Sequence, residues 1–512
     1  MKSSPIPVND AGITVDFATE FAAELASPGR TIDSQARTAA FEESHTTIPC
    51  HPLGIKPSGN KYTAVRNGKD NVGPFQLFPD EVIVIVLETL HAAELCSLGS
   101  TCKFLYAFSR SDDLWKSLFI ESKQSKGGSF VWRGTWRSTL LGLSNEHLSQ
   151  IQCGHVFSDV LFRPFLCTYT SLVPYSSSIP PKNQIARLRN LTPKEFSDDW
   201  SDKPFILTEP VRQWPVFRSW DAETLMEQYG DVKFRAEAVD WSLNTYSHYM
   251  RNSCDESPLY LFDRSFVEKM DITVGKDVPC ASYWIPECFG EDLFAVLGDK
   301  RPDDKWLIIG PARSGSTYHK DPNATSAWNA VLRGSKYWIM FPSNASSPPP
   351  PGVYVSEDQS EVTSPLSIAE WLLGFHAEAR RTPGCLEGVC GEGEVLHVPS
   401  GWWHLVVNLD ASIAITQNFV PKSHLPSVVS FLRARPDQVS GFKKDVVDPY
   451  AVFVEGMKMK HPKLLDYALE ILQTKAEGKK RKWDMAVGKD DETNRDAGFS
   501  FGFGEDSDEE VP

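Results

Sequence analysis

Apolar and polar residues alternate with two different spacings along the chain. Residues 75–119 carry apolar side chains at the spacing of an amphipathic helix, in three runs that start near Val82, Leu95 and Leu114. Pro79 suits a first helical position, and the acidic residues directly after it complement a helix N-terminus. The pattern predicts a small unit of three helices.

Between residues 155 and 435 the apolar runs become short, are rich in β-branched and aromatic residues, and are separated by Pro and Gly. Examples are KPFILTEPV, KWLIIGPA, KYWIMFP and SIAITQNFV. Many short strands with turn signals and no regular helix between them predict an antiparallel jelly roll or barrel. The expected architecture is mixed, with a small all-α unit in front of a larger β domain.

The remaining segments are set apart by their composition. Residues 1–70 are rich in Ser, Thr, Pro, Asn and Gly, which predicts a disordered arm. Residues 121–154 are expected to form a helical connector, and residues 436–475 are again expected to form helices. Residues 476–512 are polar and low in aliphatic side chains, which predicts a disordered tail with the basic run KKRK and the acidic end EDSDEE.

Charge and composition narrow the classes of protein that fit. A net charge of −15 argues against general electrostatic binding to nucleic acid or to an anionic membrane, since both need a basic surface. No apolar run approaches the roughly 20 residues needed to cross a bilayer, and the start lacks the apolar stretch of a secretory signal. The ten cysteines include no CxxC pair and are expected to be reduced. An intracellular protein is expected; KKRK favours a nuclear location, with the cytoplasm also open.

The stretch STYHKDPNATSAWNAV holds a histidine and an aspartate two residues apart, His319 and Asp321. In a strand these residues point to the same face, and Pro322 pushes Asp321 toward an extended conformation. A hydrogen-bonded structural pair is the plain interpretation of such a motif. A third ligand from another strand would complete the 2-His-1-carboxylate triad associated with non-haem Fe(II). The segment GEVLHVPSGWWHLVVNLD offers His397 and His404 for that position.

Lys336 starts the otherwise apolar run KYWIMFP. A lysine is costly to bury without an anionic partner, although on an edge strand it would face water and protect the edge. A metal-chelating dicarboxylate such as 2-oxoglutarate would be a suitable partner, because its far carboxylate needs a cation together with hydroxyl or amide donors. Such donors could come from Thr416, Asn329 and Ser316.

Two long strings, WLIIGPARSGSTYHKDPNATSAWNAVLRGSKYWIMFP and GEVLHVPSGWWHLVVNLDASIAITQNFV, resemble the JmjC oxygenases, specifically the subgroup once called phosphatidylserine-receptor-like. The resemblance continues upstream through ESPLYLFD, residues 256–263, and covers roughly 240 residues. It implies a double-stranded β-helix, a cupin-like jelly roll. It also implies Fe(II) as the metal and 2-oxoglutarate as the co-substrate.

The same resemblance assigns roles residue by residue. It implies that Fe(II) is bound by His319, Asp321 and His404, with His397 left as a packing residue and no catalytic residue beyond the metal ligands. It implies that the co-substrate is held by Lys336, Thr416, Asn329, Ser316 and Tyr246. Members of the resembled subgroup tend to carry threonine where this chain has Ser316, and the hydroxyl is kept. Tyr246 is aligned through a tyrosine upstream of the Ser-Pro-Leu-Tyr motif.

The helical unit resembles an F-box. The resemblance is carried by LFPDEV at its start, by TCKF in its second half and by DDLWK at its end. F-boxes dock an apolar face on the Skp adaptor of cullin-RING ubiquitin ligases, so residues 75–120 are expected to bind that partner. Members that never join a ligase also exist.

Together these resemblances imply an Fe(II)- and 2-oxoglutarate-dependent dioxygenase that acts on protein side chains. Hydroxylation of a protein lysine is the leading expectation, on the basis of the subgroup. Demethylation of an N-methyl group on a histone or another protein is the first alternative. A non-catalytic F-box receptor that only binds ligase targets is the second.

Overall fold

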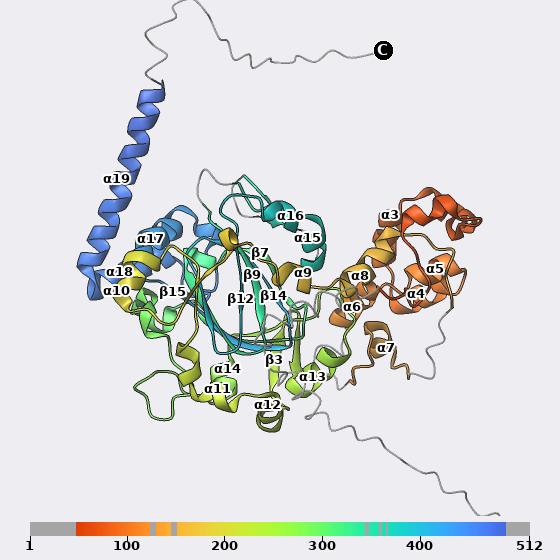
Figure 1. The fold of residues 1–512 in the computed structure, drawn as a ribbon, viewed down its shortest axis with the longest axis horizontal. Coiled ribbons are helices and arrows are strands. Elements are labelled where there is room, and N and C mark those ends of the chain that lie inside the picture. The colour runs from red at the N-terminus through yellow and green to blue at the C-terminus, as the bar shows by residue number, and fades with distance from the viewer. Residues whose placement is uncertain are drawn as a thin grey trace, which may run out of the picture.

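The computed structural model describes residues 48–122, 130–144, 151–343, 348–357, 361–364 and 367–487, with side chains as far as residue 477. A small helical unit, red to orange, lies beside a barrel of two sheets, and the blue helices near the C-terminal end pack at the opposite side (Figure 1). The ends predicted to be disordered lie outside the described residues, except for the stretches discussed below. In the part of the chain that the structure describes, no helix is both long and apolar enough to span a membrane.

The predicted helical unit contains four helices rather than three. They are α3 (Asp80–Glu88), α4 (Ala92–Gly99), α5 (Lys103–Phe108) and α6 (Asp112–Glu121). The second apolar run breaks because Cys102 caps a new helix, its sulfur accepting a hydrogen bond from the backbone of Leu105. Gly99 allows the close approach of the next turn, since a Cβ at this position would lie 2.2 Å from the Ser109 hydroxyl oxygen.

The prediction that residues 1–70 form a disordered arm was wrong for residues 48–70, which pack on the fold. Ile55 is only 3% exposed, and Lys56 exchanges backbone hydrogen bonds with Val156 and Ser158. Three 3-10 turns follow, at Ser58–Thr63, Gly68–Asn71 and Gly73–Leu77. Composition missed this segment because its order comes from pairing with distant backbone rather than from local periodicity.

The expected helical connector, residues 121–154, contains one helix in its described part, α7 (Trp136–Leu141). Trp136 is fully buried, with its ring centroid 6.0 Å from that of Trp241 and 5.8 Å from that of Tyr249. One continuous cluster of buried apolar residues runs from Ile83 and Trp115 of the helical unit through Trp136 to Trp241 and Tyr249 of the β domain. The helical unit and the β domain therefore share a core.

The β domain is a jelly roll of two facing sheets. The larger sheet has nine strands in the order β1-β2-β13-β8-β15-β6-β5-β3-β4, and the smaller has four in the order β12-β9-β14-β7. The strands of the larger sheet are β1 (Ala186–Leu188), β2 (Phe205–Leu207), β3 (Lys233–Ala236), β4 (Val239–Ser242), β5 (Leu261–Asp263), β6 (Lys305–Gly310), β8 (Ser326–Arg333), β13 (Val395–Val398) and β15 (Ser412–Phe419). Those of the smaller sheet are β7 (Gly315–His319), β9 (Lys336–Phe341), β12 (Leu386–Cys390) and β14 (Trp403–Asn408). A separate hairpin joins β10 (Tyr354–Val355) to β11 (Val362–Thr363).

The expectation of no regular helix between the strands was wrong. Helices within residues 155–435 are α8 (Asp159–Tyr169), α9 (Val173–Ser176), α10 (Pro193–Glu195), α11 (Pro215–Ser219), α12 (Ala222–Tyr229), α13 (Leu243–Asn252), α14 (Phe266–Lys269), α15 (Ile368–Gly374), α16 (His376–Ala379) and α17 (Leu425–Ala434). Half of them have five residues or fewer and the longest has 11, so their periodicity is too short to stand out from the flanking strands. Among them, α13 packs on the larger sheet and α15 on the smaller one, whereas α17 packs on the helices that follow it.

Helices α18 (Pro449–Lys460) and α19 (Pro462–Val487) follow the jelly roll. The predicted disordered tail from residue 476 is therefore partly helical, because α19 continues to Val487. The first half of this helix packs on the body, with Leu465 and Ala468 buried against α17 and α18. The basic run lies beyond the residues whose side chains are described, and the acidic end lies outside the described residues.

Candidate metal centre

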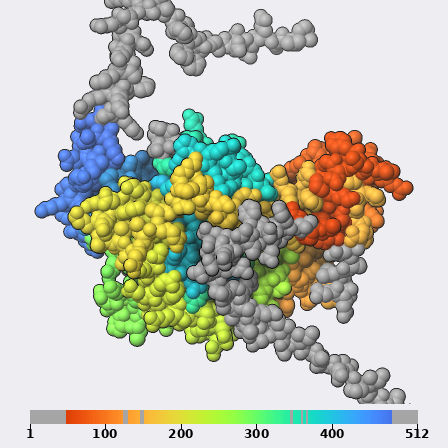
Figure 2. Space-filling model, in the orientation of Figure 1, coloured from red at the N-terminus to blue at the C-terminus, as the bar shows by residue number. Residues whose placement is uncertain are grey.

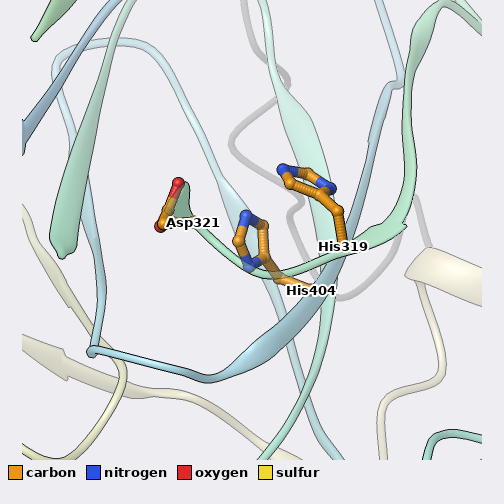
Figure 3. Close-up of side chains that lie close together, drawn as sticks. All are labelled: His319, Asp321 and His404. Carbon is orange, nitrogen blue, oxygen red and sulfur yellow. The ribbon is translucent and has the colours of Figure 1, made fainter. Parts of the chain in front are cut away.

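His319, Asp321 and His404 converge at the mouth of the barrel. One possible ligand atom from each lies within 4.8 Å of the other two. His319 ends β7 and His404 lies directly opposite it on β14, so that their ring centroids are 4.1 Å apart. Asp321 follows β7 in an extended conformation, and its carboxylate faces the two rings (Figure 3).

The backbone fixes which nitrogen each ring offers. His319 Nδ1 lies 2.8 Å from the Thr317 carbonyl oxygen, and His404 Nδ1 lies 3.1 Å from that of Trp402. A carbonyl can only accept, so Nδ1 carries the proton in both rings and the Nε2 lone pair is left for a metal. Burial lowers the pKa of His404 well below its usual range, which favours the neutral imidazole that binds metals.

The donor set fits a ferrous ion. Oδ2 of Asp321 is buried without a hydrogen-bond partner, which is costly unless a cation or another donor completes it. Two imidazole nitrogens and one carboxylate on a single face form the arrangement typical of non-haem Fe(II) sites with open positions. It is the only group of three or more possible metal ligands found among the described residues.

His397, the other histidine considered for the third position, lies in the opposite sheet on β13. Its nitrogens lie 3.2 Å from the Ala327 carbonyl oxygen and 3.1 Å from that of Ser201. The side chain is fully buried among aromatic rings, and this burial lowers its pKa to about 3. His397 is therefore a neutral packing residue, whose single ring N–H can donate to one of these two carbonyl oxygens.

Lys336 is buried inside the barrel, with a side chain 0% exposed. Its strand, β9, lies between β12 and β14, so the alternative of a lysine that protects a sheet edge is wrong. The ammonium donates to three neutral oxygens, Tyr260 Oη at 2.7 Å, Asn408 Oδ1 at 2.7 Å and Ser412 Oγ at 2.9 Å. Burial lowers the pKa of Lys336 to about 7.

No ion pair joins Lys336 to a carboxylate in the described part of the chain. A buried cation held only by neutral oxygens leaves its charge uncompensated. The barrel interior therefore offers a positive charge to an anion that enters from the mouth.

Thr416 and Asn329 lie opposite each other on β15 and β8. Asn329 is 5% exposed, and its Oδ1 has no hydrogen-bond partner, while the Thr416 hydroxyl donates to the Trp328 carbonyl oxygen at 2.8 Å. A β-bulge in β7 places Ser316 on the same face as His319. His319 is opposite His404 and Ser316 is opposite Val406, so a step of three residues on β7 matches a step of two on β14. Without the bulge, the alternation of a regular strand would point Ser316 to the other face.

The expected role of Tyr246 in co-substrate binding was wrong. Tyr246 is 0% exposed, and its hydroxyl lies within hydrogen-bond distance of the carbonyl oxygens of Leu259 and Ile309 and accepts from the backbone of Leu261. All the hydrogen-bond partners of this hydroxyl are thus backbone groups of β5, of the residue two positions before it, and of β6. Tyr260, the tyrosine of the Ser-Pro-Leu-Tyr motif itself, contacts Lys336 instead.

Asn408 and Ser412 complete the surroundings of Lys336, and the sequence-based set omitted both. Asn408 could have been found, because it lies on the same face of β14 as His404 and faces Lys336 in the register of β14 with β9. Ser412 carries no local signal, because only the fold brings the start of β15 to this point.

A cavity of about 410 Å³ adjoins the metal ligands. His319, Thr317, Ser316 and Gly315 of β7 form one wall, and the segment before β5 forms another. Lining residues from outside β7 are Glu237, Glu256, Ser257, Pro258, Arg313, Ser314 and Ile368. A substrate side chain can therefore approach the triad from this side.

Comparison with known proteins agrees with this geometry. Residues 200–425 match the cupin-like domain, and residues 75–121 match the F-box-like domain. The chain is 35% identical over 472 residues to the arginine-specific demethylase JMJ22 of Arabidopsis thaliana, which covers 89% of each chain. It is 33% identical over 267 residues to the bifunctional arginine demethylase and lysyl-hydroxylase psr-1 of Caenorhabditis elegans, covering 49% of this chain and 65% of that one. The human 2-oxoglutarate and iron-dependent oxygenase JMJD4 is 26% identical over 276 residues, covering 48% and 63%.

These matches confirm the jelly-roll and F-box predictions. The similarity to JMJ22 extends over both domains, so it includes the order in which they occur. The chain belongs to the JmjC family of iron- and 2-oxoglutarate-dependent oxygenases, and an F-box-like domain precedes its cupin-like barrel.

Proposed function

We propose that this enzyme binds Fe(II) through His319, Asp321 and His404, holds 2-oxoglutarate against Lys336, and oxidises a protein side chain. One observation carries the proposal. A three-residue donor set and a buried ammonium without a carboxylate partner face the interior of the same barrel. When bound, the iron and 2-oxoglutarate supply the oxidising chemistry, with succinate and CO2 as co-products.

The protein's own residues would bind and orient the metal and the co-substrate. The carbonyl oxygens of Thr317 and Trp402 hold both imidazole rings in one tautomer, so that the donor set is arranged before a metal arrives. The Lys336 ammonium would bind the far carboxylate of 2-oxoglutarate, with Tyr260 as a neighbouring hydroxyl. Apolar side chains between the sheets, such as Trp338 and Val406, exclude water around this position.

Hydroxylation of a protein lysine is the first candidate reaction. Demethylation is the second, because JMJ22 is named an arginine demethylase and psr-1 is named for both activities. The two reactions begin alike, with attack on a C–H bond. A hydroxylated N-methyl carbon then leaves as formaldehyde, whereas a hydroxylated lysine carbon stays.

Mass spectrometry of candidate peptides distinguishes these reactions. Peptides that carry lysine or methylated arginine are incubated with the full-length protein, Fe(II), 2-oxoglutarate and ascorbate. We expect the gain of one oxygen on lysine, whereas the loss of a methyl group would favour demethylation. The His319→Ala variant should give neither product. If no peptide raises 2-oxoglutarate turnover above its uncoupled rate, a non-catalytic ligase receptor becomes the better interpretation.

The F-box exposes an apolar face that suits a Skp adaptor. Leu77 is 79% exposed, Ile85 60% and Val86 40%, and Phe78 and Val82 lie beside them along the start of α3. The F-box protrudes from one end of the molecule, where a partner protein can reach it (Figure 2). An exposed patch of this kind, bordered by polar residues, is typical of a protein interface.

Placing a charge on this face should weaken adaptor binding strongly without changing catalysis. We expect Ile85→Asp to weaken binding of a Skp adaptor at least about thirtyfold, because the carboxylate would be buried in an apolar interface. Calorimetry with the purified adaptor measures the affinity, and succinate release measures turnover. Val131→Asp is the control, since Val131 is 65% exposed but lies outside this face. Unchanged adaptor binding in the Ile85 variant would contradict the assignment.

A further inference from the structure

A second pocket, of about 470 Å³, lies outside the barrel, among helices α4, α5, α6 and α7 at the F-box end of the molecule (Figure 1). Pockets of this volume hold small organic groups. We call it the α4–α7 pocket, and its lining includes Leu95, Tyr106, Trp115 and Ile151. The exposed apolar residues at the start of α3 are not among the described residues that line it, so it is distinct from the face proposed for the adaptor.

Three cationic side chains line the α4–α7 pocket. They are Lys103 of α5, Arg110 just after that helix, and Arg137 of α7. The described residues that line the pocket include no aspartate or glutamate. In the part of the chain that the structure describes, none of the three cations forms an ion pair. The pocket therefore gathers positive charge on a chain whose net charge is −15.

Aromatic rings hold the two guanidiniums in place. The Cζ atom of Arg110 lies 4.1 Å from the ring centroid of Tyr106, and that of Arg137 lies 5.4 Å from the ring centroid of Trp115. A contact of this kind uses the flat face of a guanidinium and leaves its N–H donors, which point outward in the plane, for an acceptor. Among the described residues, neither side chain donates a hydrogen bond to a protein atom. The N–H donors of both arginines are therefore available to a ligand.

The two guanidiniums also repel each other. Burial, and next the positive charge of Arg137, lower the pKa of Arg110. Like charges that are held together in a partly desolvated site repel more strongly than they do in water. An anion bound between them would relieve this repulsion and accept hydrogen bonds from both. A phosphate monoester suits the three cations better than a carboxylate does, because it carries about −1.5 to −2 charges at pH 7.

We propose that the α4–α7 pocket binds an organic phosphate monoester, whose phosphate oxygens accept hydrogen bonds from Arg110 and Arg137. Lys103 adds the third positive charge, and the organic group lies against the apolar part of the lining, which includes Ile151. The site is independent of the barrel and gives the F-box end a ligand of its own. The same chemical group is presented by a phosphorylated side chain of a partner protein and by a free phosphate ester.

Binding of phenyl phosphate to the full-length protein tests this proposal. Phenol carries the same ring without the phosphate, so it measures the apolar contribution alone. Ligand-observed NMR titrations give both affinities, and we expect phenyl phosphate to bind at least about tenfold more tightly than phenol. The preference should persist in the Lys336→Met variant, which removes the buried cation of the barrel. Its loss in that variant would assign the binding to the barrel and overturn the proposal.

Removing the cations one at a time locates the phosphate. Arg110→Met and Arg137→Met should each weaken binding of phenyl phosphate at least about tenfold and leave phenol binding unchanged. Both arginines also pack on aromatic rings, so circular dichroism checks that these variants are folded. Lys103→Met changes an exposed side chain and should weaken phenyl phosphate binding at least about threefold. Arg66→Met, at an exposed position outside the pocket, should change neither affinity.

A short peptide with a central phosphotyrosine separates the two sources of the ligand. Tighter binding of this peptide than of phenyl phosphate assigns the pocket to a phosphorylated partner protein, and equal binding assigns it to a free ester. Either result supports the phosphate site. Phenyl phosphate that binds no more tightly than phenol overturns it, and so does phenyl phosphate binding that is unchanged in Lys103→Met and in the folded arginine variants.

Discussion

Replacing His404 with alanine is expected to abolish 2-oxoglutarate turnover and iron binding while the barrel stays folded. His404 is 4% exposed and lies opposite His319, so its loss leaves two donors on one side of the metal position. Loss of a hydrogen-bond partner behind a ligand alone lowers metal affinity about 10- to 100-fold. Loss of the ligand itself should therefore lower iron affinity by more than about a hundredfold.

Iron content after anaerobic loading measures the first effect, and succinate release measures the second. His155→Ala is the matched control, because His155 is exposed and lies far along the chain from the candidate centre. Circular dichroism should show the same secondary structure in both variants. A His404→Ala protein that keeps one iron per chain and normal turnover would remove His404 from the ligand set.

Lys336→Met is expected to abolish 2-oxoglutarate binding and, at the same time, to stabilise the ligand-free protein. The wild-type chain buries an ammonium that only neutral oxygens contact. Methionine has a similar length and carries no charge, so the unfolding free energy should rise by about 1–2 kcal/mol, at the low end of the range for replaced buried ions. The gain is limited because Asn408 Oδ1 loses its donor.

Thermal unfolding with and without Mn(II) and 2-oxoglutarate separates these two effects. The variant should unfold at a higher temperature than wild type without ligand, and 2-oxoglutarate should no longer raise that temperature. Lys233→Met, at an exposed position on β3, is the control and should respond to 2-oxoglutarate like wild type. A Lys336→Met protein that still binds 2-oxoglutarate would contradict the role of the ammonium.

The unfolding free energy of the wild-type protein and that of the Lys336→Met variant should depend differently on pH, and the sign of this difference follows from the pKa of Lys336. Burial lowers the pKa of Lys336 to about 7, whereas an unfolded lysine titrates near 10.4. Between these two pH values the unfolded chain binds more protons than the folded chain. Lys336 therefore makes the unfolding free energy of the wild-type protein rise with pH from about 7 to about 10.4. The Lys336→Met variant lacks this contribution. Affinity for 2-oxoglutarate should fall over the same window, because the dianion needs the ammonium form.

Positions that depend on local pattern were predictable from the sequence. His319 and Asp321 share one short stretch, and Lys336 stands out in an apolar run, so each could be named from its neighbours in the chain. The surroundings of Lys336 were not predictable in this way. Tyr260, Asn408 and Ser412 come from different strands, and only the register of the sheets brings their oxygens together.

Tyr246 shows why sequence spacing misleads at such a site. It lies on α13, packed behind β5, while Tyr260 lies next to that strand and reaches the barrel interior. The two tyrosines are close in the sequence and both are buried, so neither composition nor periodicity separates them. The bulge that turns Ser316 inward is equally invisible, because it depends on pairing with β14.

The apolar cluster that links Trp115 of α6 to Trp241 of β4 joins the F-box to the oxygenase barrel through a shared hydrophobic core. Cutting the chain between them would leave Trp136 and its aromatic neighbours facing water. An adaptor attached to the F-box would thus be held in a fixed orientation toward the barrel mouth. Whatever protein the adaptor complex brings close would meet the cavity from a defined direction.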